Sequence, residues 1–365
     1  MSILYDEAQQ AIAENAARVL AARCDKSRLL ALLEQSGRFD ESFWQTCIEQ
    51  GWTAMAIPEE NGGLGLGPVE LGIVAQACGT ATAGAPFLLT NYGLSEALLL
   101  AGEPAVQALW LPRLASGEAI GALAFSEGND PLPHGASAVL YSAGMLSGAK
   151  PGVTAGLVAH VALVLAEGES GPVLAVAELE GVTRTPIDGF DNSRCLADLA
   201  FAETPATPIA QGAEALAIAR EVLARQAVAM AHEQLGGAEA LMVMARDYAL
   251  DRKAFGQPIG AFQSVKHRIA ELYTLVELAR ANCILAASLV GKPGFLKAAA
   301  SARLSATEAY DTAARDCVQI HGGIGVTWEH GLHLHMRRSR SLAIECGNMF
   351  AWEDLLAREL TGVEP

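Results

Sequence analysis

The fold of this chain is decided by a turn between two long helical stretches, Arg252-Lys-Ala-Phe-Gly-Gln-Pro-Ile-Gly-Ala-Phe-Gln263. Apolar residues recur at helical spacing over residues 221–251 before the turn and over residues 264–289 after it. The turn therefore predicts a helix end, a reversal at Pro258 and a second helix start. Because a helix start exposes backbone N–H groups and Arg252 adds a permanent cation, this motif also favours a bound diphosphate.

A second glycine turn, Gln319-Ile-His-Gly-Gly-Ile-Gly325, ends the next helical stretch, which covers residues 296–321. Its paired glycines allow the backbone to approach a ligand closely. The three stretches are separated at Pro258 and at Pro293-Gly294, and each approaches the length of a helix in a four-helix bundle. Two such turns in one bundle suggest a bound cofactor with a phosphate bridge.

The remainder of the chain predicts two further domains. Helical patterns occupy residues from about 5 to 118, including a stretch over 94–111 that is expected to stop at Pro112. From Ile120 to about Ala210, short β-prone runs alternate with Gly, Pro, Asn and Asp, which predicts a small antiparallel sandwich or barrel. We therefore predict an α+β fold with an N-terminal helical domain (1–118), a β domain (119–210) and a C-terminal helical bundle (211–365).

The composition excludes several classes of function. Lys and Arg together number 25 against 41 Asp and Glu in 365 residues, so the formal net charge is −16. So acidic a surface repels phosphate backbones and anionic lipid, which argues against nucleic-acid and membrane-surface binding. The N-terminus lacks a basic segment followed by an apolar one, and the apolar runs are too short to span a bilayer. We expect a soluble, cytoplasmic protein without membrane insertion.

Cysteines and histidines do not predict a metal centre. The seven cysteines are widely spaced and form no C-x-x-C motif, so neither a disulfide framework nor a zinc site is indicated. His330, His333 and His335 form a cluster, but no nearby thiolate or well-spaced carboxylate completes a ligand set. We expect these histidines to lie on a helix or at an interface, with no metal.

Taken together, these motifs resemble those of the acyl-CoA dehydrogenase family, flavoproteins with the same order of helical, β and helical domains. The resemblance covers nearly the whole chain. The matching segments, in chain order, are Trp52 with Pro58-Glu-Glu-Asn-Gly-Gly-Leu-Gly65, Ala124-Phe-Ser-Glu127, Leu146-Ser-Gly-Ala-Lys150, Arg252-x-x-Phe-Gly256 with Gln263, and Gln319-Ile-His-Gly-Gly323. Each segment alone is a weak signal, but all five in order and at the family spacing form a specific one.

The resemblance implies a bound FAD. On the family pattern, Phe125 and Ser126 line the flavin ring, where Ser126 offers its hydroxyl to the polar edge, and Thr154 lies against the flavin from the next strand. Arg252 pairs with the diphosphate, and Phe255 packs nearby. The adenosine end is held, in this family often across a dimer interface, by Gln263, Gln319, Gly322 and Gly323. The resemblance therefore implies an oligomer, usually a dimer of dimers.

The implied reaction is α,β-dehydrogenation of an acyl-CoA thioester. A carboxylate removes the α-proton while the β-hydrogen leaves as hydride to the flavin, and an electron-transfer flavoprotein or a similar acceptor takes the electrons. Since the α-C–H is weakly acidic, the thioester oxygen must accept hydrogen bonds, and the base needs a dry pocket and a raised pKa. The resemblance is nearest to bacterial members that act on bulky CoA esters, such as steroid side chains, and often work as α₂β₂ pairs.

The sequence departs from the family at the catalytic base. The usual Tyr-Glu-Gly-Thr motif is replaced by Ile344-Glu-Cys-Gly-Asn348, which puts Cys346 at the base position and Glu345 one residue early. Where family members place the base on the first bundle helix, this chain has Gln226, which cannot accept a proton as a base. Glu233 lies two turns further along, roughly on the same face, in an apolar stretch where burial would raise its pKa. Glu233 and Glu345 are the candidate bases; alternatively, the chain has none.

Two further departures concern the pocket. The tryptophan that normally follows the G-x-K turn is absent, because Lys150 is followed by Pro151-Gly152-Val153, and the family's substrate loop is altered around residues 130–134. These changes suggest a wider pocket, and they also fit a subunit that supports a partner's flavin site. We expect an FAD-dependent acyl-CoA dehydrogenase. The alternatives are a catalytically incomplete subunit paired with a paralogous chain, and a flavin oxidase or monooxygenase on the same fold.

Overall fold

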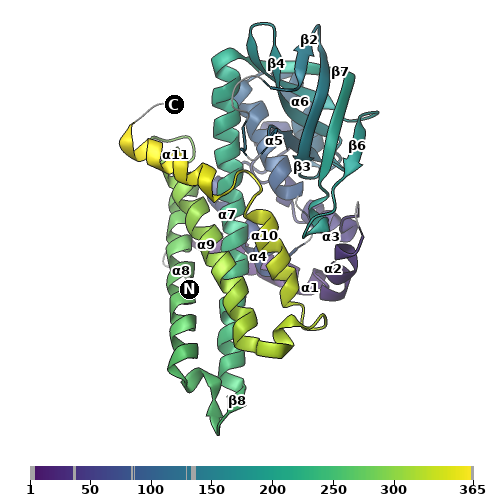
Figure 1. The fold of residues 1–365 in the computed structure, drawn as a ribbon. Helices are drawn as coiled ribbons and strands as arrows, with labels where there is room; N and C mark the ends of the chain where they lie inside the picture. Colours follow the sequence, from purple (N-terminus) through teal and green to yellow (C-terminus); the bar gives the residue numbers. More distant parts are fainter. Residues whose placement is uncertain are drawn as a thin grey trace.

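The chain forms a group of N-terminal helices, a small β-barrel and a bundle of long C-terminal helices (Figure 1). The computed structural model describes residues 5–35, 38–83, 85, 87–128, 130–132 and 137–362. Secondary structure changes from helix to strand at Gly121 and back to helix at Gly212. The predicted α+β fold, with helical, β and helical regions in that order, is confirmed. Over the described residues, no helix is both long enough and apolar enough to cross a membrane.

Short helices build the N-terminal region, and aspartates begin the first three of them. Asp6, Asp25 and Asp40 each accept a hydrogen bond from a backbone N–H in the first turn of the helix that follows. The helices are α1 (Glu7–Arg23), α2 (Lys26–Leu33), α3 (Glu41–Glu49), α4 (Pro68–Thr80), α5 (Phe87–Ala101) and α6 (Pro104–Ala115).

The predicted helix stop at Pro112 is wrong. Helix α6 continues through Pro112 to Ala115, and the predicted stretch over 94–111 is instead broken at Gly102, which has a φ of 72°. Proline near the end of a helix removes one hydrogen bond, and the buried Leu111 and Leu114 on either side hold the helical turn in the core. The left-handed conformation that ends α5 favours glycine, which makes Gly102 the natural break.

The β region closes into a barrel. Strands β4, β2, β3, β7 and β5 pair in a closed circuit, while β1 pairs with β4 and β6 pairs with β7. The barrel prediction is confirmed, but β1 and β2 run parallel to β4, whereas an antiparallel arrangement was predicted throughout. The strands are β1 (Gly121–Ala124), β2 (Leu140–Ser142), β3 (Met145–Val153), β4 (Val161–Gly168), β5 (Gly171–Glu178), β6 (Thr183–Pro186) and β7 (Ala197–Gln211).

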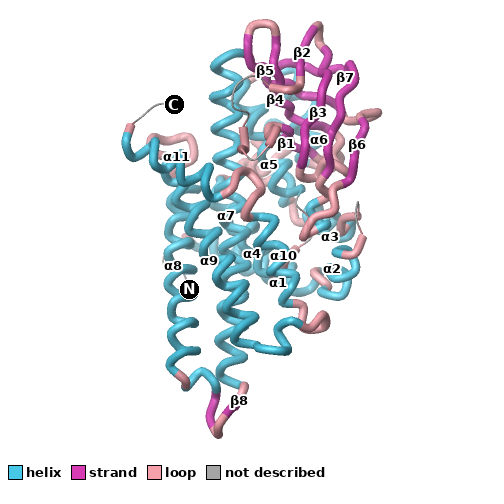
Figure 2. Tube along the Cα trace, viewed as in Figure 1, coloured by secondary structure: helices cyan, strands magenta, loops and turns pink. Residues whose placement is uncertain are grey.

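Three long helices, α7 to α9, dominate the C-terminal region. Figure 2 draws them, like all helices, in cyan. Helix α7 alone has 40 residues, and α7, α8 and α9 pack against one another. A hairpin of β8 (Lys253–Ala254) and β9 (Gln257–Pro258) projects from the far end of the bundle, away from the barrel. The helices are α7 (Gly212–Asp251), α8 (Gln263–Ser288), α9 (Phe295–His321), α10 (Leu332–Leu342) and α11 (Met349–Thr361).

Two glycines allow α4 and α7 to cross in backbone contact. A Cβ added at Gly236 would lie 1.8 Å from the carbonyl oxygen of Gln76, and one added at Gly79 would lie 1.8 Å from that of Glu233. Backbone atoms cannot rotate away as a side chain can, so any larger residue must separate the two helices. This crossing fixes the position of Glu233 relative to the N-terminal helices.

Replacing Gly236 with alanine should therefore lower the free energy of unfolding by about 2 kcal/mol, despite alanine's higher helix propensity. Urea denaturation followed by circular dichroism measures the change. Gly189→Ala is the matched control, because its added Cβ would meet Leu196 at an ordinary 3.7 Å. Equal denaturation midpoints for the two variants would contradict the close crossing.

Candidate functional site

Three predicted flavin-lining residues lie at the end of the barrel that faces the bundle. Phe125 is buried in the core just after β1, and its carbonyl oxygen accepts a hydrogen bond from the Lys150 ammonium at 3.1 Å. Ser126 is half-buried, and its hydroxyl donates to the carbonyl of Asp130 at 2.9 Å. Thr154 is half-buried just beyond β3. The structure thus brings these three residues to one region, with the Phe125 ring inside the core.

A buried lysine joins the segments that carry these residues. Lys150 on β3 is fully buried and forms an ion pair with Glu127, and it also donates to the Ser137 hydroxyl at 3.2 Å. Burial lowers the pKa of Lys150, and Glu127 acts in the opposite direction. Although burial favours the protonated form of Glu127, the hydrogen bonds from Lys150 and Ser137 lower its pKa. This pair fixes the loop after β1 against β3.

The two candidate bases meet at one buried arginine. Arg194, in the turn before β7, donates through Nε and Nη2 to the two carboxylate oxygens of Glu345, each at 2.8 Å. Its Nη1 lies 3.5 Å from Oε1 of Glu233 on α7. The side chains of Arg194, Glu233 and Glu345 are 1%, 5% and 7% exposed, so Glu233 does not lie on a solvated helix face. Both carboxylates are therefore held in ion pairs.

A second buried arginine extends the network to the N-terminal helices. Arg338 on α10 donates to Glu233 Oε1 at 2.6 Å and forms an ion pair with Asp191. It also donates to the carbonyls of Ala83 (3.0 Å) and Thr82. Burial opposes the charge on both groups, yet their attraction raises the pKa of Arg338 and lowers the pKa of Asp191. Arg338 thus joins all three regions of the chain.

A third arginine fixes the backbone of the residues that replace the family's base motif. Arg303 on α9 donates to the carbonyls of Leu342 and Glu345, and burial lowers its pKa to about 10. Cys346, at the family's base position, has a φ of 56°, in the left-handed region that non-glycine residues seldom adopt. Burial raises the pKa of its thiol to about 12, so the thiol is protonated at neutral pH.

The network contains equal numbers of opposite charges. Its arginines lie in the turn before β7, on α9 and on α10, and its carboxylates come from the same turn, from α7 and from the loop after α10. Members of such a network lie far apart in the sequence, so pattern analysis identified Glu233 and Glu345 but missed the others. The missed residues are Asp191, Arg194, Arg303 and Arg338.

The remaining predicted cofactor residues lie together at the other end of the bundle. Tyr248 of α7 stacks on His321 of α9 with ring centroids 4.2 Å apart, which brings the two glycine turns to the same end. The side chain of Phe255 is 96% exposed, with a φ of 51°. All the other predicted residues here are also exposed, namely Arg252, Gln263, Gln319, Gly322 and Gly323.

This end of the bundle is open in the single chain. Arg252 has no ion-pair partner within the described part of the chain, and a Cβ built at Gly322 or Gly323 would meet nothing within 4 Å. Arg252 follows Glu233 by 19 residues along α7, about 28 Å at the rise of an α-helix. The exposed Arg252 end of the bundle is therefore far along α7 from the buried network that holds Glu233.

The histidines form ring contacts. His321 lies edge-on to His330 at 4.8 Å, and Trp328 stacks on His333 at 4.4 Å, while the His335 ring nitrogen lies 3.0 Å from the Tyr310 hydroxyl. Across the residues that the structure describes, no group of three or more His, Cys, Asp or Glu side chains could hold a metal ion.

Next to Glu233, a neutral histidine makes the stability of this region depend on pH. His232 is fully buried, its Nδ1 bonds to the Val228 carbonyl at 2.9 Å, and its Nε2 has no partner among the described residues. Burial lowers the pKa of His232 to about 4, against the effect of that bond. Between this value and the ordinary pKa of about 6.5, the unfolded chain binds the proton and the folded chain does not. Stability is therefore lost as the pH falls.

Lowering the pH from 7.5 to 5.5 should thus remove about 1 kcal/mol of stability through His232, and about 3 kcal/mol in total by pH 4. We expect His232→Gln to show a smaller shift of the urea midpoint with pH than the wild-type chain. His267→Gln, at an exposed histidine on α8, should keep the full shift. Parallel pH profiles for the wild type and His232→Gln would exclude this role.

Comparison with known proteins places the chain in a family. Residues 6–118 match the model of the acyl-CoA dehydrogenase N-terminal domain, and residues 215–360 match that of the C-terminal domain. The chain is 34% identical over 339 residues to "Acyl-CoA dehydrogenase IpdE2" of Mycobacterium tuberculosis, covering 92% of each protein. The chain therefore belongs to the acyl-CoA dehydrogenase family, a family of flavoprotein oxidoreductases, and the predicted resemblance is confirmed.

Comparison with solved structures also indicates the acyl-CoA dehydrogenase fold. The fold superposes on one chain of the ChsE4-ChsE5 complex from Mycobacterium tuberculosis with a TM-score of 0.88, at 26% identity and over 100% of both chains. It superposes on a variant of the Tcur3481-Tcur3483 steroid acyl-CoA dehydrogenase with a TM-score of 0.87, at 25% identity and over 98% of both chains.

Proposed function

We propose that this chain is a catalytically incomplete subunit of a heteromeric, FAD-dependent acyl-CoA dehydrogenase. One observation carries the proposal: Arg194 binds both candidate bases, Glu345 through two hydrogen bonds and Glu233 through a close contact. A general base needs a lone pair directed at the substrate proton. Releasing either carboxylate from Arg194 to act as a base would leave this buried guanidinium with one ion-pair partner fewer. The loss costs free energy in a low-dielectric interior.

The other residues near the base position do not supply a substitute. Cys346 is a protonated thiol at neutral pH, since its pKa is raised to about 12 by burial. Gln226 is a buried amide on α7. The base for α-proton removal then comes from a partner subunit. The similarity to a solved structure of a two-component complex supports a paralogous chain as that partner.

In this proposal, the chain contributes to cofactor binding through the far end of its bundle. Bound FAD would supply the hydride acceptor for the reaction, with an electron-transfer flavoprotein or a similar protein as the electron acceptor. Arg252 supplies a permanent cation for the diphosphate, and the open backbone at Gly322 and Gly323 allows close approach of the adenosine end. Phe255 offers an exposed aromatic face beside them.

The substrate class is an acyl-CoA thioester with a bulky, apolar acyl group. One of the similar solved structures is a variant of a steroid acyl-CoA dehydrogenase. In this chain, Pro151-Gly152-Val153 follows Lys150 without the flavin-stacking tryptophan of the family, and a Cβ added at Gly152 would meet nothing within 4 Å. Both observations support a wide site in the assembled enzyme.

The first experiment measures FAD per polypeptide from the visible absorption spectrum. We expect the chain purified alone to carry little flavin, and a complex co-expressed with a paralogous dehydrogenase chain encoded nearby to carry it. A chain that alone holds about one FAD and oxidises acyl-CoA would refute the proposal. Rapid reaction of the reduced flavin with oxygen would instead identify an oxidase or monooxygenase.

A self-sufficient dehydrogenase with Glu345 as base is the second candidate, and the position of Glu345 near the predicted flavin-lining residue Thr154 supports it. The backbone N–H of Ala155, next to Thr154, donates to the Arg194 carbonyl at 3.0 Å, and Arg194 in turn binds Glu345. Turnover per bound FAD separates the two candidates. In the complex, Glu233→Gln and Glu345→Gln should each change turnover less than about twofold, as should the exposed control Glu329→Gln, whereas loss of a true base costs roughly 10²–10⁴-fold.

A further inference from the structure

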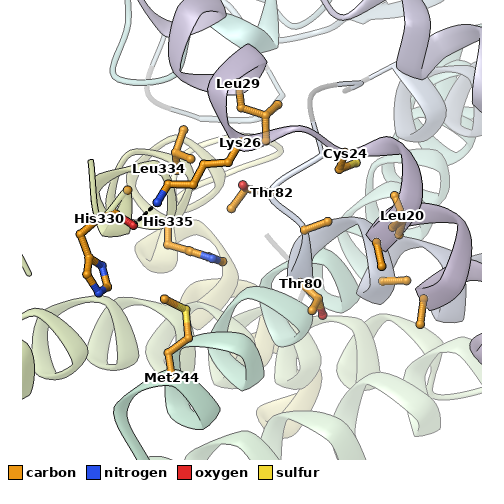
Figure 3. Close-up of a pocket in the computed structure, with 15 residues that line it drawn as sticks. Leu20, Cys24, Lys26, Leu29, Thr80, Thr82, Met244, His330, Leu334 and His335 are labelled. Atoms are coloured by element: carbon orange, nitrogen blue, oxygen red, sulfur yellow. Dashed lines mark hydrogen bonds between the residues drawn. The ribbon is translucent and has the colours of Figure 1, made fainter. Parts of the chain in front are cut away.

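A cavity of about 460 Å³ lies between the N-terminal helices and the bundle (Figure 3). Its walls come from α1, α2, α4, α7 and the start of α10, and they are mainly apolar. Leu20, Leu29, Leu334 and Met244 line it together with several alanines. In Figure 3, Met244 and His335 point into the cavity from below and from one side. Its volume and lining are those of a site for a small apolar molecule.

The cavity is separate from the buried ion-pair network. None of the network residues or predicted FAD residues is among its lining residues. Met244 follows Glu233 by 11 residues on α7, which is about 16 Å along the helix. Thr82 forms part of the partition, because its carbonyl accepts a hydrogen bond from Arg338 while the residue also lines the cavity.

A positively charged group is fixed at the mouth of this apolar cavity. The Lys26 ammonium donates to the carbonyls of Glu329, at 2.6 Å, and His330, which leaves one of its three N–H donors available. The aliphatic part of the Lys26 side chain packs over Gly331. A Cβ added there would lie 2.3 Å from Lys26 Cε, so a larger residue would displace the lysine. His330 also lines the cavity, but its ring contacts that of His321 and its Nδ1 is buried away from the open space.

The charge at the mouth selects the kind of ligand. Within the described ranges, no aspartate or glutamate lines the cavity, although the chain as a whole has a net charge of −16. An apolar body would lie against the walls, and an anionic head would meet the remaining N–H donor of Lys26. We propose that this cavity binds an apolar monocarboxylate, one molecule per chain, at a site distinct from that of the acyl-CoA substrate. A single ammonium suits a carboxylate, whereas a CoA diphosphate would need several cations.

Isothermal titration with dodecanoate tests the proposal on the full chain in the oligomeric state in which it is isolated. We expect saturable binding of one dodecanoate per chain. Lys26→Met should weaken dodecanoate binding about tenfold and change the binding of neutral dodecan-1-ol less than twofold. Ala17→Phe, at an exposed α1 position that lines the cavity, should weaken both ligands at least tenfold. Lys266→Met, at an exposed lysine on α8, is the matched control and should change neither.

Three results would overturn the proposal. The first is the absence of saturable dodecanoate binding to the wild-type chain. The second is an equal loss of affinity in Lys26→Met and Lys266→Met, which would indicate a general charge effect. The third is loss of dodecanoate binding when a partner subunit is added, which would assign the cavity to a protein interface. Urea midpoints of the variants confirm that each protein compared is folded.

Discussion

Replacing Arg338 with methionine should lower the free energy of unfolding by about 3–5 kcal/mol, or prevent folded chain from accumulating. The guanidinium is buried and binds Asp191, Glu233 and two carbonyls in the turn after α4. Methionine fills much of the volume but leaves two buried carboxylates without their main partner. Urea denaturation, followed by circular dichroism, measures the loss.

Arg337→Met is the matched control for this prediction. Arg337 is the neighbouring residue on α10, half-buried, and it donates to the Phe190 carbonyl at 3.1 Å. Its loss should cost less than about 1 kcal/mol. The double variant Glu233→Gln with Arg338→Met should be less destabilised than the sum of the single variants, because the two side chains are in contact. Similar midpoints for Arg337→Met and Arg338→Met would show that the network contributes little.

The second large effect concerns Arg252. In the assembled complex, Arg252→Ala should weaken FAD binding about 10- to 100-fold, because a charge-assisted hydrogen bond to a diphosphate contributes about 1.5–3 kcal/mol. Titration of the flavin-depleted complex with FAD, followed by flavin fluorescence, gives the dissociation constant. The stability of the chain should change little, because Arg252 is exposed and has no ion-pair partner within the described ranges.

The adjacent exposed lysine provides the control. Lys253→Ala removes one positive charge at nearly the same place and should weaken FAD binding less than about threefold. Arg252→Lys should fall between these variants, because a lysine keeps the charge and loses the bidentate geometry. If Arg252→Ala binds FAD as tightly as the wild-type complex, the turn after α7 does not hold the diphosphate.

Most of the fold could be predicted from local signals in the sequence. The long apolar periodicities around Pro258 and Pro293-Gly294 predicted α7, α8 and α9, because helix length and turn residues are local properties. The same rules failed at Pro112, where the buried neighbours Leu111 and Leu114 outweigh the missing hydrogen bond. The sequence also did not predict the parallel pairing of β1 with β4, because strand pairing depends on the tertiary arrangement of segments that are distant in the sequence.

The candidate site was predictable only in part. Glu233 and Glu345 were found from their place in the family pattern, whereas Arg194 and Arg338 were not, because their partners are distant in the sequence. One signal was available: Arg303 stands within the alanine-rich run of residues 298–306, where a charge among small apolar residues indicates burial. Such a buried charge requires a partner, but the sequence does not say which.

The division of the predicted cofactor residues between the barrel and the far end of the bundle would have a thermodynamic consequence in the proposed assembly. If each FAD is held by one subunit at the barrel end and by another at the Arg252 end, cofactor binding and subunit association share one free energy. Dilution would then release flavin without any heating or denaturant, and added FAD would draw subunits back together. The concentration at which flavin fluorescence appears would report the dissociation constant of the assembly, so the cofactor itself would act as the probe of quaternary structure.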